Sequence, residues 1–383
     1  MKRLAQIVVF LLASASTVAR AQLDRPSGFS EISAESVTAV DEALAFLARI
    51  QNGDGSWTGD VGYKLNQNYE ISDRSVHHVG VTALAGLAYL SAGHLPSRGL
   101  YGEQIGRATD WLLSQISENG YITASGSRMY SHAFAALFLA EVYGMTDRPG
   151  MRKDLQSAID FIVSCQNEHG SWRYEPLASE SDMSITVCQL NALRAARNVG
   201  IRVPRSTIDR AKDYIARSFV NQDMGFGGQG SYYQLGRGSF KYQVSRSTRS
   251  SFALTSAGLA ALHSAGVDDL QFTWTFEDGQ VMEIDLEQSI QFLRDTIRSV
   301  SDGSAYENHY FYWYGHYYAT QALYTIGGEP WAWYFPQISA ELLAKQRSTG
   351  AFPCRTGPGE AFSTAIGAVI LSLPYGYLPI FQR

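Results

Sequence analysis

Gln51-Asn52-Gly53-Asp54-Gly55-Ser56-Trp57 is the stretch that decides the fold, because this polar turn recurs along the chain. It returns as Gln166-Asn167-Glu168-His169-Gly170-Ser171-Trp172. The glycines at the six corresponding positions lie 65, 50, 55, 78 and 47 residues apart. This spacing indicates a repeat architecture in which one helical unit is used many times. Looser versions of the turn surround the other four glycines: Gly120, Gly225, Gly303 and Gly350.

The segments on the two sides of each turn differ in charge. Residues 40–50, 208–219 and 287–297, which precede turns, mix charged and apolar residues at the spacing of a helix with one solvent-facing side. The segments that follow turns carry no charged residue, and a helix that is apolar all round must be covered on every side. The clearest of them are 79–91, 133–140, 252–262 and 361–373.

This alternation predicts two concentric rings of helices. We expect an all-α fold, an (α/α)6 toroid of six helix pairs, in a single domain over residues 37–383. Small hairpins are expected only at 232–244 and 272–284, the second around the turn Asp278-Gly279. The aromatic residues that follow the glycines are expected to pack beneath the turns: Trp57, Tyr121, Trp172, Phe226 and Phe352.

The N-terminus has the composition of an export signal. Lys2 and Arg3 precede an apolar run at 4–15, and Ala19-Arg20-Ala21 fits a small-x-small cleavage site. We therefore predict a signal peptide over 1–21, a short tether over 22–36, and a periplasmic or extracellular protein with no membrane span after cleavage. A net charge of −5 disfavours nucleic acid as a partner.

The chain has three cysteines, too few for a disulfide framework. Cys165 and Cys188 lie in consecutive helices, so a single bridge is possible in an oxidising compartment. Three separately packed thiols are the equally weighted alternative.

The Gln-x-x-x-Gly-Ser-Trp turns and Gly225-Phe226-Gly227-Gly228 resemble repeats of the squalene cyclase and protein prenyltransferase β-subunit superfamily. The resemblance implies the toroid over nearly the whole mature chain. The Asp-x-Asp-Asp proton donor of the cyclases is absent from the sequence, and Glu307-Asn308-His309 and Glu360–Thr364 do not match the prenyltransferase zinc ligands. No cofactor is predicted.

The resemblance also implies that ligands enter where the inner helices begin. Five of the eight histidines fall in those segments, which makes an acid–base role worth considering. A zinc site of His77 or His78 with His132 and Asp73 is the alternative, but no two ligands have the spacing of one helix face. The candidate residues at the cavity mouth are Asp73, Arg74, His77, His78, Tyr130, His132, Asp182, Arg249, His309, Tyr312, Trp313 and His316.

Three classes of function fit these observations. The favoured one is an exported protein that binds a small molecule, lipid or polypeptide at the central cavity. The alternatives are a divergent isoprenoid enzyme, either a terpene cyclase or a prenyl transferase, and a carbohydrate-active (α/α)6 lyase or hydrolase. A dry aromatic cavity with a basic rim would favour isoprenoids, and an open groove with paired carboxylates would favour sugars.

Overall fold

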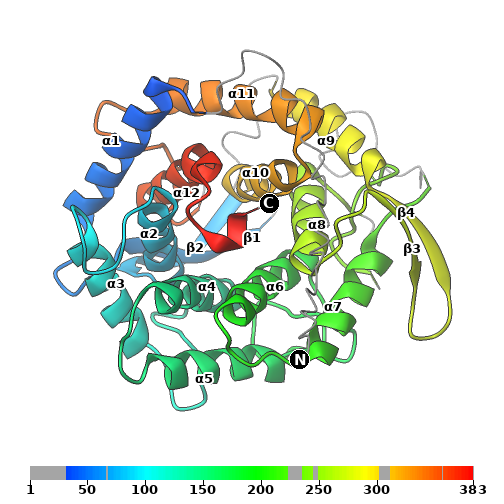
Figure 1. Ribbon diagram of the computed structural model, residues 1–383, viewed down its shortest axis with the longest axis horizontal. Helices are drawn as coiled ribbons and strands as arrows, with labels where there is room; N and C mark the ends of the chain where they lie inside the picture. The colour runs from blue at the N-terminus through cyan, green and yellow to red at the C-terminus, as the bar shows by residue number, and fades with distance from the viewer. Residues whose placement is uncertain are drawn as a thin grey trace, which may run out of the picture.

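The computed structural model describes residues 32–65, 68–222, 235–244, 249–301, 311–355 and 357–382. Twelve helices in these ranges form two concentric rings, which confirms the predicted (α/α)6 toroid (Figure 1). The outer ring consists of α1 (Ala34–Ile50), α3 (Gly102–Ser114), α5 (Met151–Ser164), α7 (Arg205–Ser218), α9 (Leu286–Ser301) and α11 (Gly328–Lys345). The inner ring consists of α2 (Val79–Ser91), α4 (Met129–Met145), α6 (Met183–Asn198), α8 (Phe252–Ser264), α10 (Phe311–Ile326) and α12 (Glu360–Ser372).

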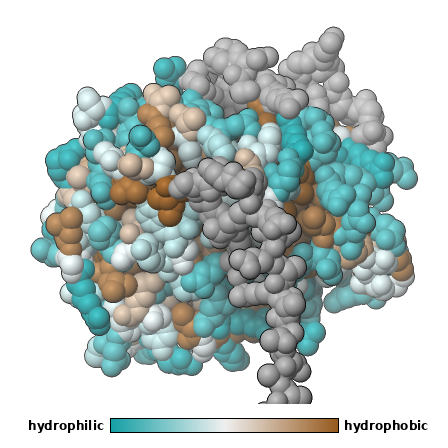
Figure 2. Space-filling model, turned by 45° about the horizontal axis from the view of Figure 1, so that its top comes forward, coloured by the Kyte–Doolittle hydropathy of each residue, from teal (hydrophilic) through white to brown (hydrophobic). Residues whose placement is uncertain are grey.

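The burial of the helices follows the charge pattern of the sequence. Every residue of α2 is buried, whereas α7 buries one face and exposes its charged side. Burying apolar surface contributes roughly 25 cal/mol per Å², so the burial of the inner helices against the apolar faces of the outer ones stabilises the fold. Hydrophilic residues cover much of the outer surface, with hydrophobic ones scattered among them (Figure 2).

The glutamine of the recurring turn joins neighbouring outer helices. The Gln51 side-chain amide donates to the carbonyl of Gly55 at 2.9 Å and to the carbonyl of Gln104, in α3, at 3.0 Å. Gln166 makes the same pair of bonds to Gly170 and to Thr207 in α7. These bonds explain why the repeat needs a glutamine. The glycine is needed because its φ is positive and because a Cβ there would collide with the backbone of the next outer helix.

The last repeat closes the ring by the same device. Gln346, which follows α11, donates to Gly350 at 3.0 Å and to Ala39 of α1 at 2.7 Å. The final outer helix is thereby tied to the first one. Closure of the circle therefore uses the same two hydrogen bonds as the steps at Gln51 and Gln166.

The tryptophans of the turn are structural, as expected. The indole N–H of Trp57 donates to the carbonyl of Leu47 at 2.9 Å, and that of Trp172 donates to Ile162 at 2.7 Å. Both rings are buried. Each tryptophan therefore locks the turn onto the outer helix that precedes it. Phe226 lies outside the described residues.

The structure adds one hairpin that the sequence did not predict. Strands β1 (Thr58–Leu65) and β2 (Asn68–His77) pair antiparallel across the segment expected to be the polar start of the first inner helix. The predicted hairpin around Asp278-Gly279 is confirmed as β3 (Gln271–Thr275) and β4 (Val281–Asp285). Within 235–244 the structure has a single isolated bridge and no strand.

The N-terminal predictions are only partly covered by the structure. The predicted signal peptide lies outside the described residues, and α1 already begins at Ala34, within the predicted tether. Among the helices described, none combines the length and the apolar composition needed to cross a bilayer.

All three cysteines are free thiols, so Cys165 and Cys188 pack separately.

The C-terminal segment returns to the axis of the toroid (Figure 1). Ile380 and Phe381 are buried there, and the Phe381 ring lies 6.3 Å from that of Tyr317 on α10. Glu141, on α4, is also buried, and its carboxyl group accepts a hydrogen bond from the backbone of Ile380. The segment therefore packs inside the inner ring on the side where α4 ends.

Glu141→Gln is expected to stabilise the protein in alkaline buffer. Burial raises the pKa of Glu141 from 4.5 to about 7, so its stabilising contribution is complete below pH 4.5 and is lost as the pH rises through 7. At pH 8 the variant should be about 1–3 kcal/mol more stable than the wild type, and at about pH 4 the two should be nearly equal. Urea denaturation at both pH values measures this, and an equal stability at pH 8 would contradict it.

Candidate functional site

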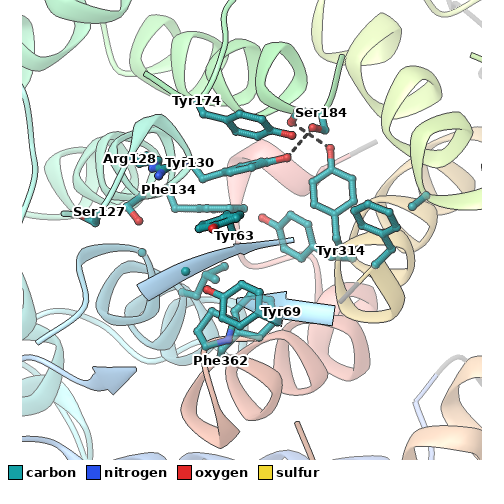
Figure 3. Close-up of a pocket in the computed structure, with 18 of the residues that line it drawn as sticks. Tyr63, Tyr69, Ser127, Arg128, Tyr130, Phe134, Tyr174, Ser184, Tyr314 and Phe362 are labelled. Carbon is teal, nitrogen blue, oxygen red and sulfur yellow. Dashed lines mark hydrogen bonds between the residues drawn. The ribbon is translucent and has the colours of Figure 1, made fainter. Parts of the chain in front are cut away.

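A cavity of about 880 Å³ opens at the amino ends of the inner helices. All six inner helices contribute to its wall, together with the β1–β2 hairpin. Ten of the side chains in the wall are aromatic, and several of them are labelled in Figure 3. Its aromatic residues are Tyr63, Tyr69, Tyr130, Phe134, Tyr174, Tyr242, Phe311, Tyr314, Tyr317 and Phe362.

The β1–β2 hairpin supplies two of these rings, Tyr63 and Tyr69. It is tied to the loop before α12 by a hydrogen bond from the backbone N–H of Asp60 to the carbonyl of Pro358, at 2.8 Å. The Tyr69 hydroxyl donates back to the carbonyl of Asp60 at 3.2 Å. The hairpin is therefore a fixed part of the cavity wall.

Hydroxyl groups gather at one end of the cavity, around the start of α6. The Tyr130 hydroxyl donates to Ser184 Oγ at 2.5 Å, and the Ser184 hydroxyl donates to Asp182 Oδ1 at 2.5 Å. Tyr314 donates to the backbone carbonyl of Ser184 at 3.0 Å (Figure 3). Asp182 is the N-cap of α6 and is fully buried, and this burial raises its pKa against the opposing hydrogen bonds from Ser184, Tyr242 and Tyr174.

A second pair of hydroxyls continues this network. Those of Tyr174 and Tyr242 lie 2.5 Å apart. Burial and the nearby Asp182 carboxyl raise the pKa of both phenols, so they stay protonated at neutral pH. Arg249 stacks on the Tyr242 ring, with its guanidinium carbon 3.9 Å from the ring centroid.

The other two arginines of the wall form ion pairs with glutamates. Arg128 lies 2.9 Å from Glu175, and Arg173 lies 2.9 Å from Glu180. Among the described residues that line the cavity there is no aspartate or glutamate. The described wall is thus aromatic, hydroxyl-bearing and basic.

Three of the candidates chosen from the sequence line this cavity: His78, Tyr130 and Arg249. His78 is the N-cap of α2, where its Nδ1 accepts the backbone N–H of Val81 at 3.3 Å. Burial lowers the pKa of His78 to about 4, so it is neutral at pH 7. It can accept or donate a hydrogen bond there but carries no charge.

Asp73, Arg74 and His77 lie on β2, and not at a helix start as expected, because the hairpin occupies that segment. His77 instead belongs to a surface cluster in which its Nδ1 is 2.7 Å from Asp54 and 2.9 Å from Ser56 Oγ. Both contacts converge on one ring nitrogen. A serine–histidine–carboxylate relay needs the two nitrogens to face opposite partners, so this cluster is no nucleophilic triad.

His132 and His316 are buried among structural partners. His132 Nδ1 accepts the backbone N–H of Ile122 at 3.0 Å, and its Nε2 contacts the carbonyl of Ala158 at 3.2 Å. His316 bonds to the hydroxyl of Tyr334, on α11, at 2.9 Å. Burial lowers the pKa of each histidine to about 4. Neither is among the residues that line the cavity.

The face of helix α10 that lines the cavity is not the face that carries the candidates Tyr312, Trp313 and His316. Tyr312 donates to Glu341 of α11 at 2.7 Å, and the Trp313 ring lies 6.1 Å from that of Phe352. Phe311, Tyr314 and Tyr317 line the cavity instead. His309 lies outside the described residues.

Several lining residues had no signal that singled them out in the sequence. Tyr63 and Tyr69 depend on the unpredicted hairpin, and Tyr174 and Tyr242 lie in loops. The turn pattern offers the one available clue, since Tyr174 follows two residues after Trp172. No rule of helix periodicity applies to such positions.

The superfamily's zinc does not fit the residues present. Among the described residues, no group of three or more histidine, cysteine, aspartate or glutamate side chains converges as a metal site would require. In the region that corresponds to one of the two ligand segments, α12 begins with Glu360 and has neither histidine nor cysteine. No step of a mechanism is therefore assigned to a metal.

Known proteins share the fold at low sequence identity. An α-amylase from Clostridium perfringens has a TM-score of 0.56 at 9% identity and covers 88% of this chain and 97% of its own. Cellobiose 2-epimerase from Bacillus thermoamylovorans has a TM-score of 0.56 at 13% identity and covers 88% of this chain and 98% of its own. An α-1,6-mannanase from Salegentibacter sp. has a TM-score of 0.57 at 8% identity and also covers 88% of this chain and 98% of its own. At such identities the likeness shows the fold alone.

Comparison by sequence is more specific. No curated protein sequence matches the chain. The family model described as prenyltransferase alpha-alpha toroid domain matches residues 56–295, which contain most of the cavity wall. The range includes the whole of the turn Gln166–Trp172 and the last two residues, Ser56 and Trp57, of the first turn. By this match the chain belongs to the prenyltransferase alpha-alpha toroid domain family.

Proposed function

We propose that the protein binds a predominantly apolar small molecule, of the isoprenoid or long-chain type, in the central cavity. The observation that carries the proposal is the ring of ten aromatic side chains around this space at the amino ends of the inner helices. Its volume of about 880 Å³ is in the range of small-molecule sites. Aromatic walls gain free energy by covering apolar ligand surface from water.

The two enzymatic alternatives receive less support from the described wall. Glycoside hydrolysis usually needs two carboxyl groups that flank the bond to be cleaved, and the described lining residues include no aspartate or glutamate. A divergent isoprenoid enzyme would use the same apolar ligand. It would also need the superfamily's proton donor or zinc ligands, which the sequence lacks. Binding without catalysis is the simpler function.

We also propose that binding takes place outside the cytoplasm. The support is the composition of residues 1–21, with Lys2 and Arg3 before an apolar run and Ala19-Arg20-Ala21 at its end. N-terminal sequencing of the protein recovered from the periplasm or medium would test this. A mature chain that begins at Gln22 is expected, and retention of Met1 in the cytoplasm would contradict it.

Calorimetric titration with farnesene, an isoprenoid hydrocarbon, tests the binding function. We expect saturable one-to-one binding. Ala253→Trp and Ile366→Trp, which place bulk into the cavity from α8 and from α12, should each weaken it by at least about tenfold, which is about 1.4 kcal/mol. Thermal melting of each variant shows whether it is folded. Absence of saturable binding to the wild type, or unchanged affinity in a folded variant, would contradict the proposal.

A further inference from the structure

The polar end of the cavity has a fixed direction of hydrogen bonding. A serine or tyrosine hydroxyl has one proton to donate. The Ser184 proton goes to Asp182 Oδ1, so Tyr130 must be the donor in its 2.5 Å bond to Ser184 Oγ. The Tyr314 proton goes to the backbone carbonyl of Ser184. All three hydroxyl protons are thus used within the protein.

Hydroxyl oxygens whose protons are used in this way act toward a ligand as acceptors. The rings of Tyr130 and Tyr314 lie 6.3 Å apart, edge to face, so both oxygens belong to the same end of the cavity. A diphosphate or carboxylate needs donors and would place its oxygens against the lone pairs of these groups. A ligand hydroxyl can donate to them.

The charges around this end point the same way. Arg128 and Arg173 are each paired with a glutamate at 2.9 Å. Arg249 stacks on Tyr242, whose hydroxyl interacts with the buried Asp182. Among the described residues, two guanidinium groups, those of Arg128 and Arg173, are therefore each matched by a carboxyl group. A polyanion would have to separate these pairs and approach a buried carboxyl group, at a cost in electrostatic free energy.

We infer that the ligand is an uncharged long-chain alcohol, whose hydroxyl group donates its one proton to the oxygen of Tyr130 while its chain lies against the aromatic wall. This inference rests on the proposed function and names the ligand's polar group. The hydroxyl end faces α6, and the hydrocarbon extends toward Phe134, Phe311 and Phe362.

Three probes with one hydrocarbon skeleton separate the possibilities: farnesol, farnesyl diphosphate and farnesene. Their dissociation constants are measured by calorimetry with the full folded protein. We expect farnesol to bind about tenfold or more tightly than farnesyl diphosphate, and more tightly than farnesene by the value of one hydrogen bond, about three- to tenfold. Diphosphate binding as tight as that of the alcohol would overturn the inference and leave the proposed function standing. Binding of none of the three would overturn both.

A variant pair assigns the effect to the named hydroxyl. Tyr130→Phe should weaken farnesol about three- to tenfold and leave farnesene unchanged, because the hydrocarbon makes no hydrogen bond. Tyr143→Phe is the matched control: Tyr143 also lies on α4, away from the cavity, where its hydroxyl accepts from Arg152 at 3.3 Å. It should change neither affinity. An equal loss for both probes in Tyr130→Phe would show a purely structural role and overturn the assignment.

Discussion

His132→Ala is expected to lower the free energy of unfolding by about 3–5 kcal/mol at pH 7. The imidazole is completely buried and bonds through Nδ1 to the N–H of Ile122 and through Nε2 to the carbonyl of Ala158. Alanine leaves a cavity and removes the partners of two backbone groups at once. Denaturant-induced unfolding measures the loss.

The control for this variant is His169→Ala. His169 lies in the Gly170 turn, with its side chain 53% exposed and only a 3.6 Å contact to Glu168. Its replacement should change stability by less than about 0.5 kcal/mol. A loss below about 1 kcal/mol for His132→Ala would contradict the structural role assigned to that ring.

The His132 effect should also depend on pH. Burial lowers the pKa of His132 to about 4, below its ordinary value of 6.5. The contribution of the neutral ring is therefore complete above pH 6.5 and is lost as the pH falls toward 4. The stability gap between wild type and His132→Ala should narrow by about 2 kcal/mol between pH 7 and pH 5. A gap that stays constant would contradict the buried neutral ring.

Gly170→Ala is expected to lower the free energy of unfolding by about 2–4 kcal/mol. Gly170 has φ +78°, where an L side chain is strained, and a Cβ there would lie 2.2 Å from the carbonyl oxygen of Arg210 in α7. That oxygen belongs to a helix backbone and cannot move aside without shifting α7. The same approach to the next outer helix recurs at Gly55, Gly120 and Gly350.

Gly200→Ala separates backbone strain from contact. Gly200 has the same φ of +78°, but a Cβ there would meet nothing within 4 Å. Gly200→Ala should therefore lower the free energy of unfolding only by the strain of the left-handed conformation, about 1 kcal/mol. Equal losses in the two variants would show that the close approach of the turn to α7 contributes nothing.

The ring architecture could be predicted because its causes are local and repeated. The charge-free segment 79–91 coincides with α2, and the glycine turn precedes it as expected. What the sequence could not show is the bond from the turn's glutamine to the next outer helix. Gln166 and Thr207, for example, are 41 residues apart, and only the closed fold brings them together.

The cavity was harder to predict than the fold. On α10 the candidates from the sequence included Tyr312 and His316, but both side chains pack on α11. Periodicity groups residues by face and gives no sign of which face a hollow lies on. The hairpin that supplies Tyr63 was missed, because Gly59, Gly62 and Asp60 interrupt the strand pattern of β1.

A crystal structure of the protein with farnesol tests the central claim most directly. The account predicts one farnesol molecule inside the aromatic cavity, with its oxygen within hydrogen-bond distance of the Tyr130 hydroxyl and its chain against Phe134. A cavity that holds only water, with farnesol bound elsewhere or absent at saturating concentration, would contradict it.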